Sequence, residues 1–405
     1  MSDSPVRASS SARVAPGVVL TGIRFVSPEG IRSGPLRLAR GRVDPGEPRD
    51  GDVVVRLDGH LVLPGLLNAH DHLPLNAFPD VPDLGVFTNA AGWIDTLQPI
   101  LDSAPFRATR AIDPELRAWH GALKNLLSGA TTVAHHDPWL DAMAREDFPV
   151  RVVSPYGWCH SPRLAGRYGP DLEESFADTP EGARWFLHLA EGTDAEARGE
   201  LALVDRRGLL DSRTVAIHGV GFSPEDVARL LAAGASLVWC PASNLRVLGT
   251  TLDPAPVLAA GRLALGTDSR LSGSVDLLDE LRAARRVSGL PASSLLRLVT
   301  EDAASVLGLM GPGRLEGGSP ADLVVVRGDE DEEEPCGTLL EATRARLRAV
   351  VRGGVPRVAD PDLLPWLDAA GAEPRAARLD GREKVVDARL FPPAVAALER
   401  GLELL

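Results

Sequence analysis

Four short apolar runs in this chain each end in a histidine or an aspartate. They close at His70 and His72, at His188, at His218 and at Asp268. A short apolar run of this kind is typical of a strand buried in a parallel sheet. In a barrel of parallel strands the C-terminal ends all open onto one face, which is where such barrels keep their active sites. The pattern therefore predicts an α/β fold with these polar side chains gathered at one end of a barrel.

The first run ends in two histidines that are separated by one residue. Side chains at positions i and i+2 of a strand point to the same side, so we expect His70 and His72 to project together. Two neutral imidazoles that converge on one point suit a divalent metal ion. A His-x-His pair by itself also fits a solvated junction between a strand and a loop. The other three runs favour the metal site.

Seven segments of the chain have the apolar character of barrel strands. They are residues 62–68, 131–135, 150–154, 185–189, 214–218, 236–240 and 262–267. The stretch from 161 to 184 is too polar and too broken to supply a convincing eighth strand. Either one strand is short and disguised in that stretch, or the barrel is distorted there.

Short β-type runs with glycine and proline between them lie on both sides of this segment. Neither side is large enough to close a sheet of its own. We therefore expect a (β/α)8-type TIM barrel, complete or distorted, over residues 63–312. Residues 16–62 and 313–405 would together build a composite β-sandwich-like domain. Residues 1–15 are rich in serine and are expected to be disordered.

The tail from Pro361 to Leu405 mixes apolar and charged residues and is expected to finish in a helix over 394–404. It would cover either the sandwich or a second subunit, and the second arrangement would make the protein a homodimer. The run Asp329–Glu334 is interpreted as a solvated loop, because like charges that are packed together repel one another.

The formal net charge of −13 argues against nucleic acid and anionic membranes as partners, because both are polyanions. The three cysteines are far apart and form no C-x-x-C motif, so neither a disulfide framework nor a cysteine zinc site is indicated. This cysteine usage is typical of a cytoplasmic protein. The start of the chain lacks the apolar core of a secretory signal, and no apolar run is long enough to predict a transmembrane helix.

A set of short motifs follows the order that is found in one enzyme superfamily. The motifs are Pro64-Gly65 with Asn68-Ala69-His70-Asp71-His72, Ser128-Gly129-Ala130-Thr131-Thr132, His188-Leu189-Ala190-Glu191, His218-Gly219-Val220, Cys240-Pro241-Ala242-Ser243-Asn244, Gly266-Thr267-Asp268-Ser269 and Gly317–Val325. On these residues the chain resembles the amidohydrolase superfamily, and most closely its mononuclear metal-dependent deaminases and chlorohydrolases. As a set the motifs are highly specific. The resemblance also implies the barrel with its composite second domain.

Three imidazoles and one carboxylate, from His70, His72, His188 and Asp268, would hold one divalent ion. Zn²⁺ is the ion that this set suits best, with Fe²⁺ and Mn²⁺ as alternatives. Such an ion lowers the pKa of a bound water from about 15.7 toward about 7, and so supplies hydroxide at neutral pH.

Three residues would handle protons and charge. Glu191 follows His188 by three residues, where it could take the proton of the water and return it to a leaving nitrogen. His218 would face the same cavity and stabilise the charge that develops on the substrate. Asp268 could also accept a hydrogen bond from the attacking water. Each of these residues matches a functional position of the superfamily, so the resemblance implies these roles.

Further side chains are expected to contact the substrate. They are His135, His136, Trp158, Trp239, Asn244 and Ser269. His135 and His136 end the second strand and would be substrate contacts or an additional metal ligand. Trp239 stands where the superfamily commonly has a histidine, which predicts a flatter, aromatic wall. Trp158 would line the pocket or pack in the core.

Binuclear members of the superfamily bridge two ions with a carboxylated lysine. The two lysines of this chain, Lys124 and Lys384, lie on a predicted helix and in the tail, so a mononuclear site is favoured. His120 carries no motif and is interpreted as structural.

The expected reaction is the hydrolytic deamination of a small cyclic amidine or aminated heterocycle, at a carbon–nitrogen bond other than a peptide bond. The same residues could instead hydrolyse a cyclic amide, an N-alkylamine or a carbon–halogen bond. A non-catalytic metal-binding or ligand-binding barrel is a third hypothesis, which a content of less than about one metal ion per chain would support.

Overall fold

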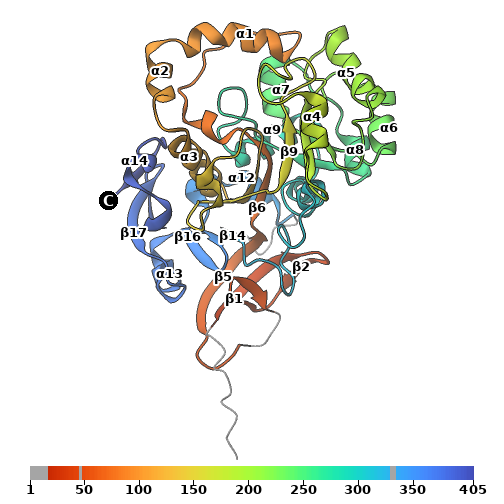
Figure 1. Ribbon diagram of the computed structural model, residues 1–405. Helices are drawn as coiled ribbons and strands as arrows, with labels where there is room; N and C mark the ends of the chain where they lie inside the picture. The colour runs from red at the N-terminus through yellow and green to blue at the C-terminus, as the bar shows by residue number, and fades with distance from the viewer. Residues whose placement is uncertain (1–16, 45–47, 329–333) are drawn as a thin grey trace, which may run out of the picture.

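The computed structural model describes residues 17–44, 48–328 and 334–405 (Figure 1). Figure 1 shows strands from the two ends of the chain in the lower part and at the side, with the helices of the middle segment above them. The predictions for residues 1–15 and for all but the last residue of the acidic run Asp329–Glu334 lie outside the described residues.

Parallel strands form the centre of the middle segment. Within the described residues they make a three-stranded sheet, in the order β6-β7-β8, and a five-stranded sheet, in the order β13-β12-β11-β10-β9. The bounds are β6 Leu66–Asp71, β7 Ala130–His135, β8 Arg151–Val152, β9 Tyr156–Cys159, β10 Arg184–Leu189, β11 Thr214–His218, β12 Ser236–Trp239 and β13 Leu263–Leu265. Neighbouring strands in both sheets are parallel and follow one another in sequence. This succession is that of a TIM-barrel-like fold.

The predicted strands 131–135, 150–154, 185–189, 214–218, 236–240 and 262–267 each overlap one of these strands, whereas the first predicted strand is divided. Its residues 62–64 belong to β5 (Val53–Pro64) of the outer sheet, and barrel strand β6 begins at Leu66. The break falls at Gly65. A Cβ atom there would lie 2.4 Å from the Thr131 hydroxyl oxygen, so the close approach of the two strands requires a glycine.

The strand that the sequence analysis could not find is β9, which lies just before the stretch 161–184 rather than inside it. Its sequence is Tyr-Gly-Trp-Cys, and of these four residues only Cys159 is buried, so it lacks the fully buried apolar run that marks strands such as β11. The stretch 161–184 instead contains the short helix α4 (Leu172–Ala177). Composition therefore disguised this strand.

Helices connect the strands of the barrel, and further helices lie between the outer-sheet strands along the chain. The remaining helices are α1 Ala90–Leu101, α2 Ala104–Arg110, α3 Pro114–Leu127, α5 Ala195–Arg206, α6 Pro224–Ala232, α7 Pro241–Leu248, α8 Ala255–Ala259, α9 Leu277–Ser288, α10 Ala292–Arg297, α11 Glu301–Leu307, α12 Gly337–Glu341, α13 Leu364–Ala369 and α14 Pro393–Ala396. Helix α3 shows why they start where they do: the Asp113 carboxylate accepts the N–H of Glu115 at 2.8 Å, and Pro114 occupies the first turn.

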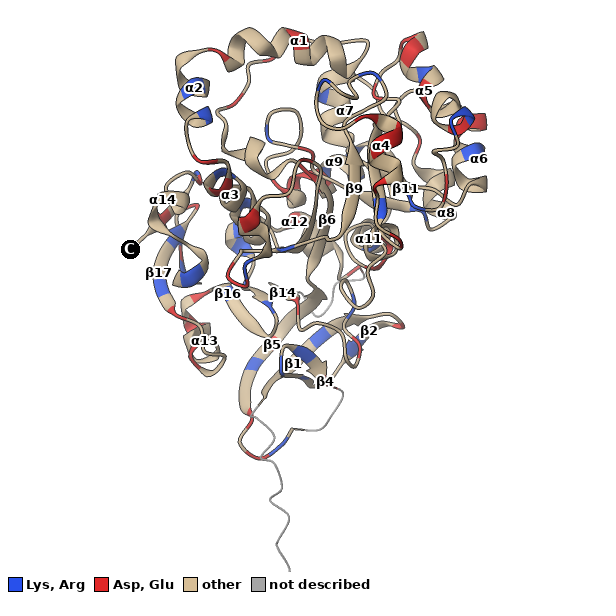
Figure 2. Cartoon of the chain, viewed as in Figure 1, with Lys and Arg blue, Asp and Glu red and all other residues tan. Residues whose placement is uncertain are grey.

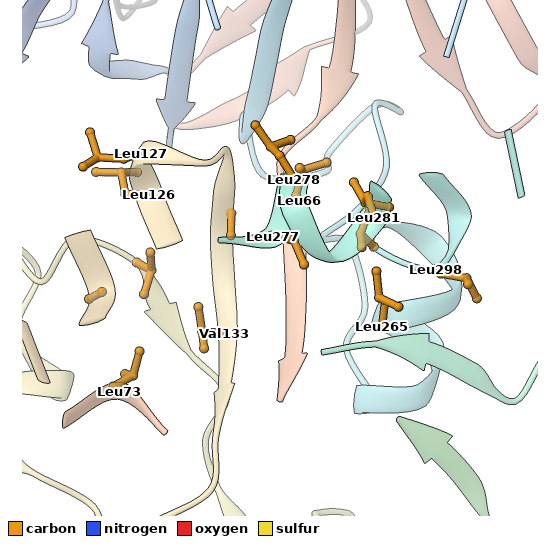
Figure 3. Close-up of a cluster of buried hydrophobic side chains, with 14 of the residues drawn as sticks. Leu66, Leu73, Leu126, Leu127, Val133, Leu265, Leu277, Leu278, Leu281 and Leu298 are labelled. Atoms are coloured by element: carbon orange, nitrogen blue, oxygen red, sulfur yellow. The ribbon is translucent and has the colours of Figure 1, made fainter. Parts of the chain in front are cut away.

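The barrel and its helices share a leucine-rich core (Figure 3). Leu126 and Leu127 of α3 and Leu277 of α9 lie beside Leu66 of β6 and Val133 of β7, and all five side chains are fully or almost fully buried. Their burial fixes the strand ends that carry the polar residues.

Strands from both ends of the chain form one 11-stranded sheet outside the barrel. Its order is β19-β17-β18-β16-β15-β14-β5-β1-β3-β4, with β2 paired to β1. The bounds are β1 Val18–Ser27, β2 Gly30–Ser33, β3 Leu36–Ala39, β4 Arg42–Asp44, β14 Leu323–Arg327, β15 Ala349–Arg352, β16 Val355–Ala359, β17 Pro374–Leu379, β18 Arg382–Asp387 and β19 Leu402–Leu404. The two ends join where β5 pairs with β14 in antiparallel register.

The tail does not end in the helix that was predicted for residues 394–404. Helix α14 stops at Ala396, and Leu402–Leu404 form the edge strand β19, which pairs with β17. Among the described residues, none of the helices combines the length and apolar character that crossing a bilayer would require.

Candidate metal and active site

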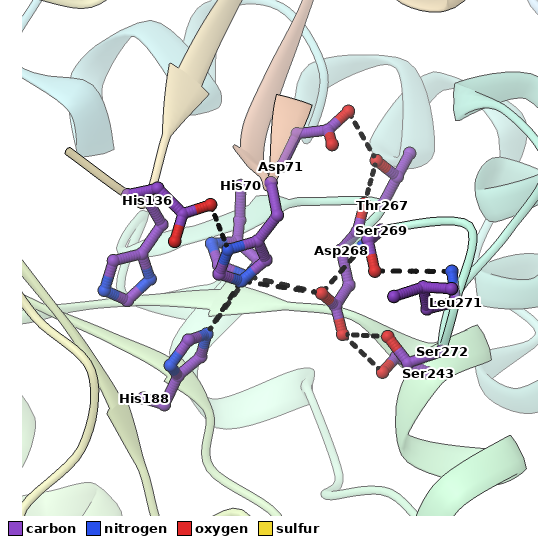
Figure 4. Close-up of polar contacts among 12 residues, drawn as sticks. His70, Asp71, His136, His188, Ser243, Thr267, Asp268, Ser269, Leu271 and Ser272 are labelled. Atoms are coloured by element: carbon purple, nitrogen blue, oxygen red, sulfur yellow. Dashed lines mark hydrogen bonds and ion pairs between the residues drawn. The ribbon is translucent and has the colours of Figure 1, made fainter. Parts of the chain in front are cut away.

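Four imidazoles converge where strands β6, β7 and β10 end (Figure 4). One ring nitrogen from each of His70, His72, His136 and His188 lies within 4.8 Å of the others, and all four residues are buried. Nε2 of His188 lies 3.3 Å from Nε2 of His72 and 3.3 Å from Nε2 of His70. The structure thus brings together the three histidines of the predicted ligand set, and His136 with them.

Asp268 approaches this cluster from the loop after β13. Its Oδ1 lies 3.8 Å from Nε2 of His70 and 3.7 Å from Nε2 of His72. Its Oδ2 accepts hydrogen bonds of 2.7 Å from the hydroxyls of Ser243 and Ser272, as the dashed lines in Figure 4 mark. These hydroxyls fix the carboxylate so that its other oxygen faces the imidazoles.

Acceptors outside the cluster orient two of the rings. Nδ1–H of His72 donates to the Asp137 carboxylate at 2.9 Å, and Nδ1–H of His188 donates to the His160 carbonyl at 2.7 Å. Each ring therefore turns its Nε2 atom inward, which is how proteins orient imidazoles for a metal ion. Nδ1 of His136 is buried, and within the described residues it has no hydrogen-bond partner. Such a donor set fits a divalent ion.

Burial and nearby carboxylates together set the charge of these rings. It lowers the pKa of His70 and of His188 well below the usual value, and neighbouring imidazoles lower it further, so both are neutral and able to bind a metal. For His72, burial acts in the same direction, but the carboxylates of Asp137 and Asp268 outweigh it and raise the pKa to about 9.

Glu191 and His218 form a pair beside the cluster. Glu191 Oε1 lies 3.5 Å from Nε2 of His218, and Nδ1–H of His218 donates to the Asn244 amide oxygen at 2.8 Å. Burial raises the pKa of Glu191 to about 7, although His218 opposes the rise. A carboxyl group with this pKa exchanges protons readily near neutral pH. Asn244, predicted as a substrate contact, is instead a buried support of His218.

Two strand ends at this site have an unusual backbone. His218 has φ +75 and Asp268 has φ +55, in the left-handed region that residues other than glycine rarely adopt. Conformations of this kind persist where the surrounding structure enforces them, and they are common at functional sites.

The other predicted substrate contacts lie at different depths. Ser269 lines the cavity next to Asp268. Trp239 is fully buried in the core, where its Nε1–H donates to Thr251, and it does not line the cavity. The aromatic wall that was predicted at this position is therefore wrong, because the end of β12 turns this side chain into the core.

His135 and Trp158 also lie outside the cavity lining. His135 is buried, and its Nδ1 accepts the N–H of Leu73 at 3.4 Å. Trp158 packs edge-on against His136, with ring centroids 5.8 Å apart. Both residues therefore lie next to the histidine cluster but outside the cavity.

The cavity beside the histidine cluster has a volume of about 420 Å³, which suits a small molecule. At its polar end it is lined by His72, Asp137, His188, Glu191, His218 and Asp268. Helix α1 supplies an apolar wall that sequence analysis missed, which includes Trp93, Ile94 and Leu97. This wall follows no family motif, and the signal that could have found it is the amphipathic pattern of residues 90–101.

A buried network supports the first strand end from behind. The Lys124 ammonium donates to the Asp71 carboxylate at 3.1 Å, and neither side chain has any exposed surface. It also donates to the Asn76 amide oxygen at 3.0 Å and to the Thr267 hydroxyl at 3.3 Å. Because Asp71 lies between the two histidines and Thr267 precedes Asp268, the network ties both segments to α3.

Two further buried carboxyl groups hold the loops of the site. Glu200 accepts the backbone N–H of Ala190 at 2.7 Å, and Glu280 accepts that of Ala242 at 3.0 Å. Burial raises the pKa of both groups to about 8. They fix the backbone next to Glu191 and, on the other side, next to Ser243.

The tail also reaches this region. The Glu399 carboxylate, which has no exposed surface, accepts hydrogen bonds from Arg270 at 3.0 and 2.9 Å and from Nε2 of His120 at 2.7 Å. It also pairs with Arg344. His120 therefore has the structural role that was predicted, and the loop that follows Asp268 is attached to the end of the chain.

A comparison with protein families matches part of the chain. The model of the Amidohydrolase family matches residues 177–356, a segment that includes His188, His218 and Asp268. Over this segment the chain is similar to that family. Together with the histidine cluster and the deaminase names of its relatives, the match supports a metal-dependent hydrolase.

Curated relatives of this chain carry deaminase names. It is 26% identical over 390 residues to the 5-methylthioadenosine/S-adenosylhomocysteine deaminase of Halobacterium salinarum, an alignment that covers 82% of this chain and 89% of the relative. It is 27% identical over 380 residues to the 8-oxoguanine deaminase of Pseudomonas aeruginosa, which covers 74% of this chain and 83% of the relative.

Solved structures support the TIM-barrel-like fold of this chain. It superposes with a TM-score of 0.68 on the zinc complex of atrazine chlorohydrolase from Arthrobacter aurescens, with 21% identity and coverage of 87% of this chain and 99% of the other. For an adenosine deaminase from Xanthomonas campestris with bound zinc, the TM-score is 0.65 at 20% identity, covering 88% and 97%. The TIM-barrel-like fold is thus shared by both.

Proposed function

We propose that this protein is an amidohydrolase that removes an amino group, by hydrolysis, from a small cyclic amidine or aminated heterocycle. The observation that carries the proposal is the Glu191–His218 pair, which lies beside the histidine cluster and ends in a carboxyl group with a pKa of about 7. Deamination needs one group that first accepts a proton from water and then gives it to the leaving nitrogen. The deaminase names of the curated relatives support the same reaction.

We further propose that His70, His72, His188 and Asp268 hold one ion and that this ion is Zn²⁺. Nitrogen ligands with one carboxylate suit zinc, and two solved structures of the same fold contain it. A bound ion of this kind would lower the pKa of water and act as a Lewis acid.

The side chains around the ion divide the remaining work. Glu191 accepts a proton from the attacking water and delivers it to the nitrogen that leaves as ammonia. His218 turns Nε2 toward the cavity, because Nδ1 is engaged by Asn244, and it stabilises the charge that develops on the substrate. Asp268, held by two serine hydroxyls, can accept a hydrogen bond from the water.

The finer architecture is also a proposal. We propose that residues 63–312 close into a barrel and that residues 16–62 and 313–405 act as one composite domain. Closure is supported by the backbone N–H of Thr267, which donates to the His70 carbonyl at 3.0 Å and so links the loop after β13 to β6. The pairing of β5 with β14 supports the composite domain.

The test is ammonia release from zinc-loaded protein with purines, pyrimidines, their nucleosides, pterins and aminotriazines. At least one aminated ring is expected to release ammonia, and Glu191→Gln should abolish the release while it retains the metal. Glu196→Gln, at an exposed position on α5, is the matched control. If zinc-loaded protein releases no ammonia but releases an alkylamine or chloride from substituted triazines, the proposed reaction is wrong and the alternative hydrolysis stands.

A further inference from the structure

We propose that the substrate of this amidohydrolase carries an anionic oxygen group, such as a carboxylate, at the end remote from the amino group, and that Arg117 binds it. This inference rests on the proposed deaminase function and adds a specificity site to it. Arg117 belongs to no motif of the sequence, and it lines the same cavity as Glu191 and His218.

The cavity has two chemically different ends. Imidazoles and carboxylates line the strand ends, where the metal ligands and Glu191 lie. Helices α1 and α2 form an arm that continues into α3. Arg110 ends α2 and Arg117 lies in the first turn of α3, so both line the cavity where this arm joins the barrel. Figure 1 shows this arm arching above the barrel, and Figure 2 shows the basic positions on α2.

The Arg117 guanidinium is charged but poorly compensated. Within the described residues no carboxylate lies within ion-pair distance of it, and its Nε–H donates to the Ile112 carbonyl at 3.2 Å. Its terminal nitrogens therefore remain available. Burial lowers the pKa of Arg117, and the positive charge of Arg110 lowers it further, while Asp113 acts in the opposite direction. A half-buried cation without a partner costs free energy, and an anionic ligand would offset that cost.

Arg117 is also held in position for a planar anion. Its guanidinium lies over the ring of Phe78, 5.4 Å from the centroid, and Phe78 stacks on Phe106. A guanidinium that is fixed in this way presents a fork of N–H donors, which matches the two oxygens of a carboxylate. Arg110, which pairs with exposed Asp102 at 3.3 Å, adds positive charge nearby.

The proposed reaction fixes the direction in which a substrate enters. The amino-bearing ring must lie beside Glu191 and His218, at the metal end. An anionic tail on that ring would then extend away from the metal end toward Arg117. Trp93 and Leu97 of α1 also line the cavity and suit an aromatic ring or an aliphatic stem.

The test compares pairs of compounds that differ in one anionic group. Suitable pairs are pterin with pterin-6-carboxylate and 9-methyladenine with adenine-9-acetate. For the wild type, kcat/KM is expected to favour the anionic member by about tenfold or more, which corresponds to about 1.4 kcal/mol. Arg117→Met should bring the ratio close to one, Arg117→Lys should retain part of it, and Arg107→Met on the exposed face of α2 should leave it unchanged.

A wild-type ratio near one, or a preference that survives in Arg117→Met, would overturn the inference while the deaminase function stands. If no compound releases ammonia, the proposed function fails, and equilibrium binding of the same pairs to zinc-loaded Glu191→Gln protein then decides the inference. Tighter binding of the anionic member that disappears in the Glu191→Gln/Arg117→Met double variant would support it. Equal binding of both members would overturn it.

Discussion

At the scale of single residues, the protonation of Glu191 controls the proposed reaction. Because burial raises its pKa to about 7, the carboxylate that acts as a base forms only as the pH rises through that value. We expect kcat/KM to increase with pH up to about 7, and we expect Glu191→Gln to lower kcat by about 10²–10⁴-fold. A pH profile of the initial rates measures both effects. Near-normal turnover by the variant would remove Glu191 as the proton carrier.

His188 is expected to act through the ion. Its Nε2 lies 3.3 Å from those of His70 and His72, so removal of this ring opens one side of the proposed ligand set. His188→Ala should lower the zinc content per chain, measured by elemental analysis, together with activity. His60→Ala, in the outer sheet, is the control and should keep its zinc. Unchanged zinc in His188→Ala would show that the ligand set is wrong.

The sequence alone located most of the residues that face the cluster, because each ends an apolar strand or its following turn. It could not locate Arg117 or place Trp239. Arg117 reaches the cavity from the first turn of a helix, where no strand pattern marks it. Like the histidines, Trp239 ends a strand, but its indole ring packs against neighbouring residues in the core. The position of a residue on a strand predicts at which end of the barrel the residue lies. It predicts less well the direction in which the side chain points.

At the scale of secondary-structure elements, helix α3 supports β6 through Lys124. Removing one member of a buried ion pair leaves the other charge without a partner, which costs about 3–5 kcal/mol. We expect Lys124→Met to lower the free energy of unfolding by this amount in urea titrations. The double variant Lys124→Met/Asp71→Asn should recover part of the loss, because it removes the isolated charge. A fully additive loss would contradict this account.

The strands that were predicted well and the one that was missed differ in composition. Apolar, mostly β-branched runs such as Thr214–His218 are buried on both faces and are visible in the sequence. Strand β9 has only four residues, three of them partly exposed, and it is defined by its pairing with β10 rather than by a buried apolar run. The division between β5 and β6 depends on the contact between Gly65 and Thr131, which no local pattern reveals.

At the scale of the whole molecule, Glu399 joins the tail to the barrel. Burial would raise its pKa, but hydrogen bonds from His120 and Arg270 hold the pKa well below the usual value. Its contribution to stability is therefore fully present above the unfolded pKa of about 4.3, and it is lost as the pH falls through the folded value.

Glu399→Gln is expected to lower the free energy of unfolding by about 3–5 kcal/mol at pH 7, since it takes the carboxylate partner from buried Arg270 and leaves Arg344 with Asp380 alone. Glu403→Gln is the matched control, because its pair with Arg378 is largely exposed and should be worth less than about 1 kcal/mol. Chemical denaturation at pH 7 and pH 4 measures both variants. Equal stability of the two variants would contradict the role of Glu399.

The contact between Arg270 and Glu399 has a consequence for the order in which the protein matures. The two residues are 129 positions apart, and the second leaves the ribosome well after the barrel has been synthesised. Until it arrives, the loop that holds Asp268 lacks its outer anchor. A nascent chain can thus form its leucine core before the active site is complete. A chain truncated before Glu399 would retain the four histidines, but the loop that holds Asp268 would lack this contact.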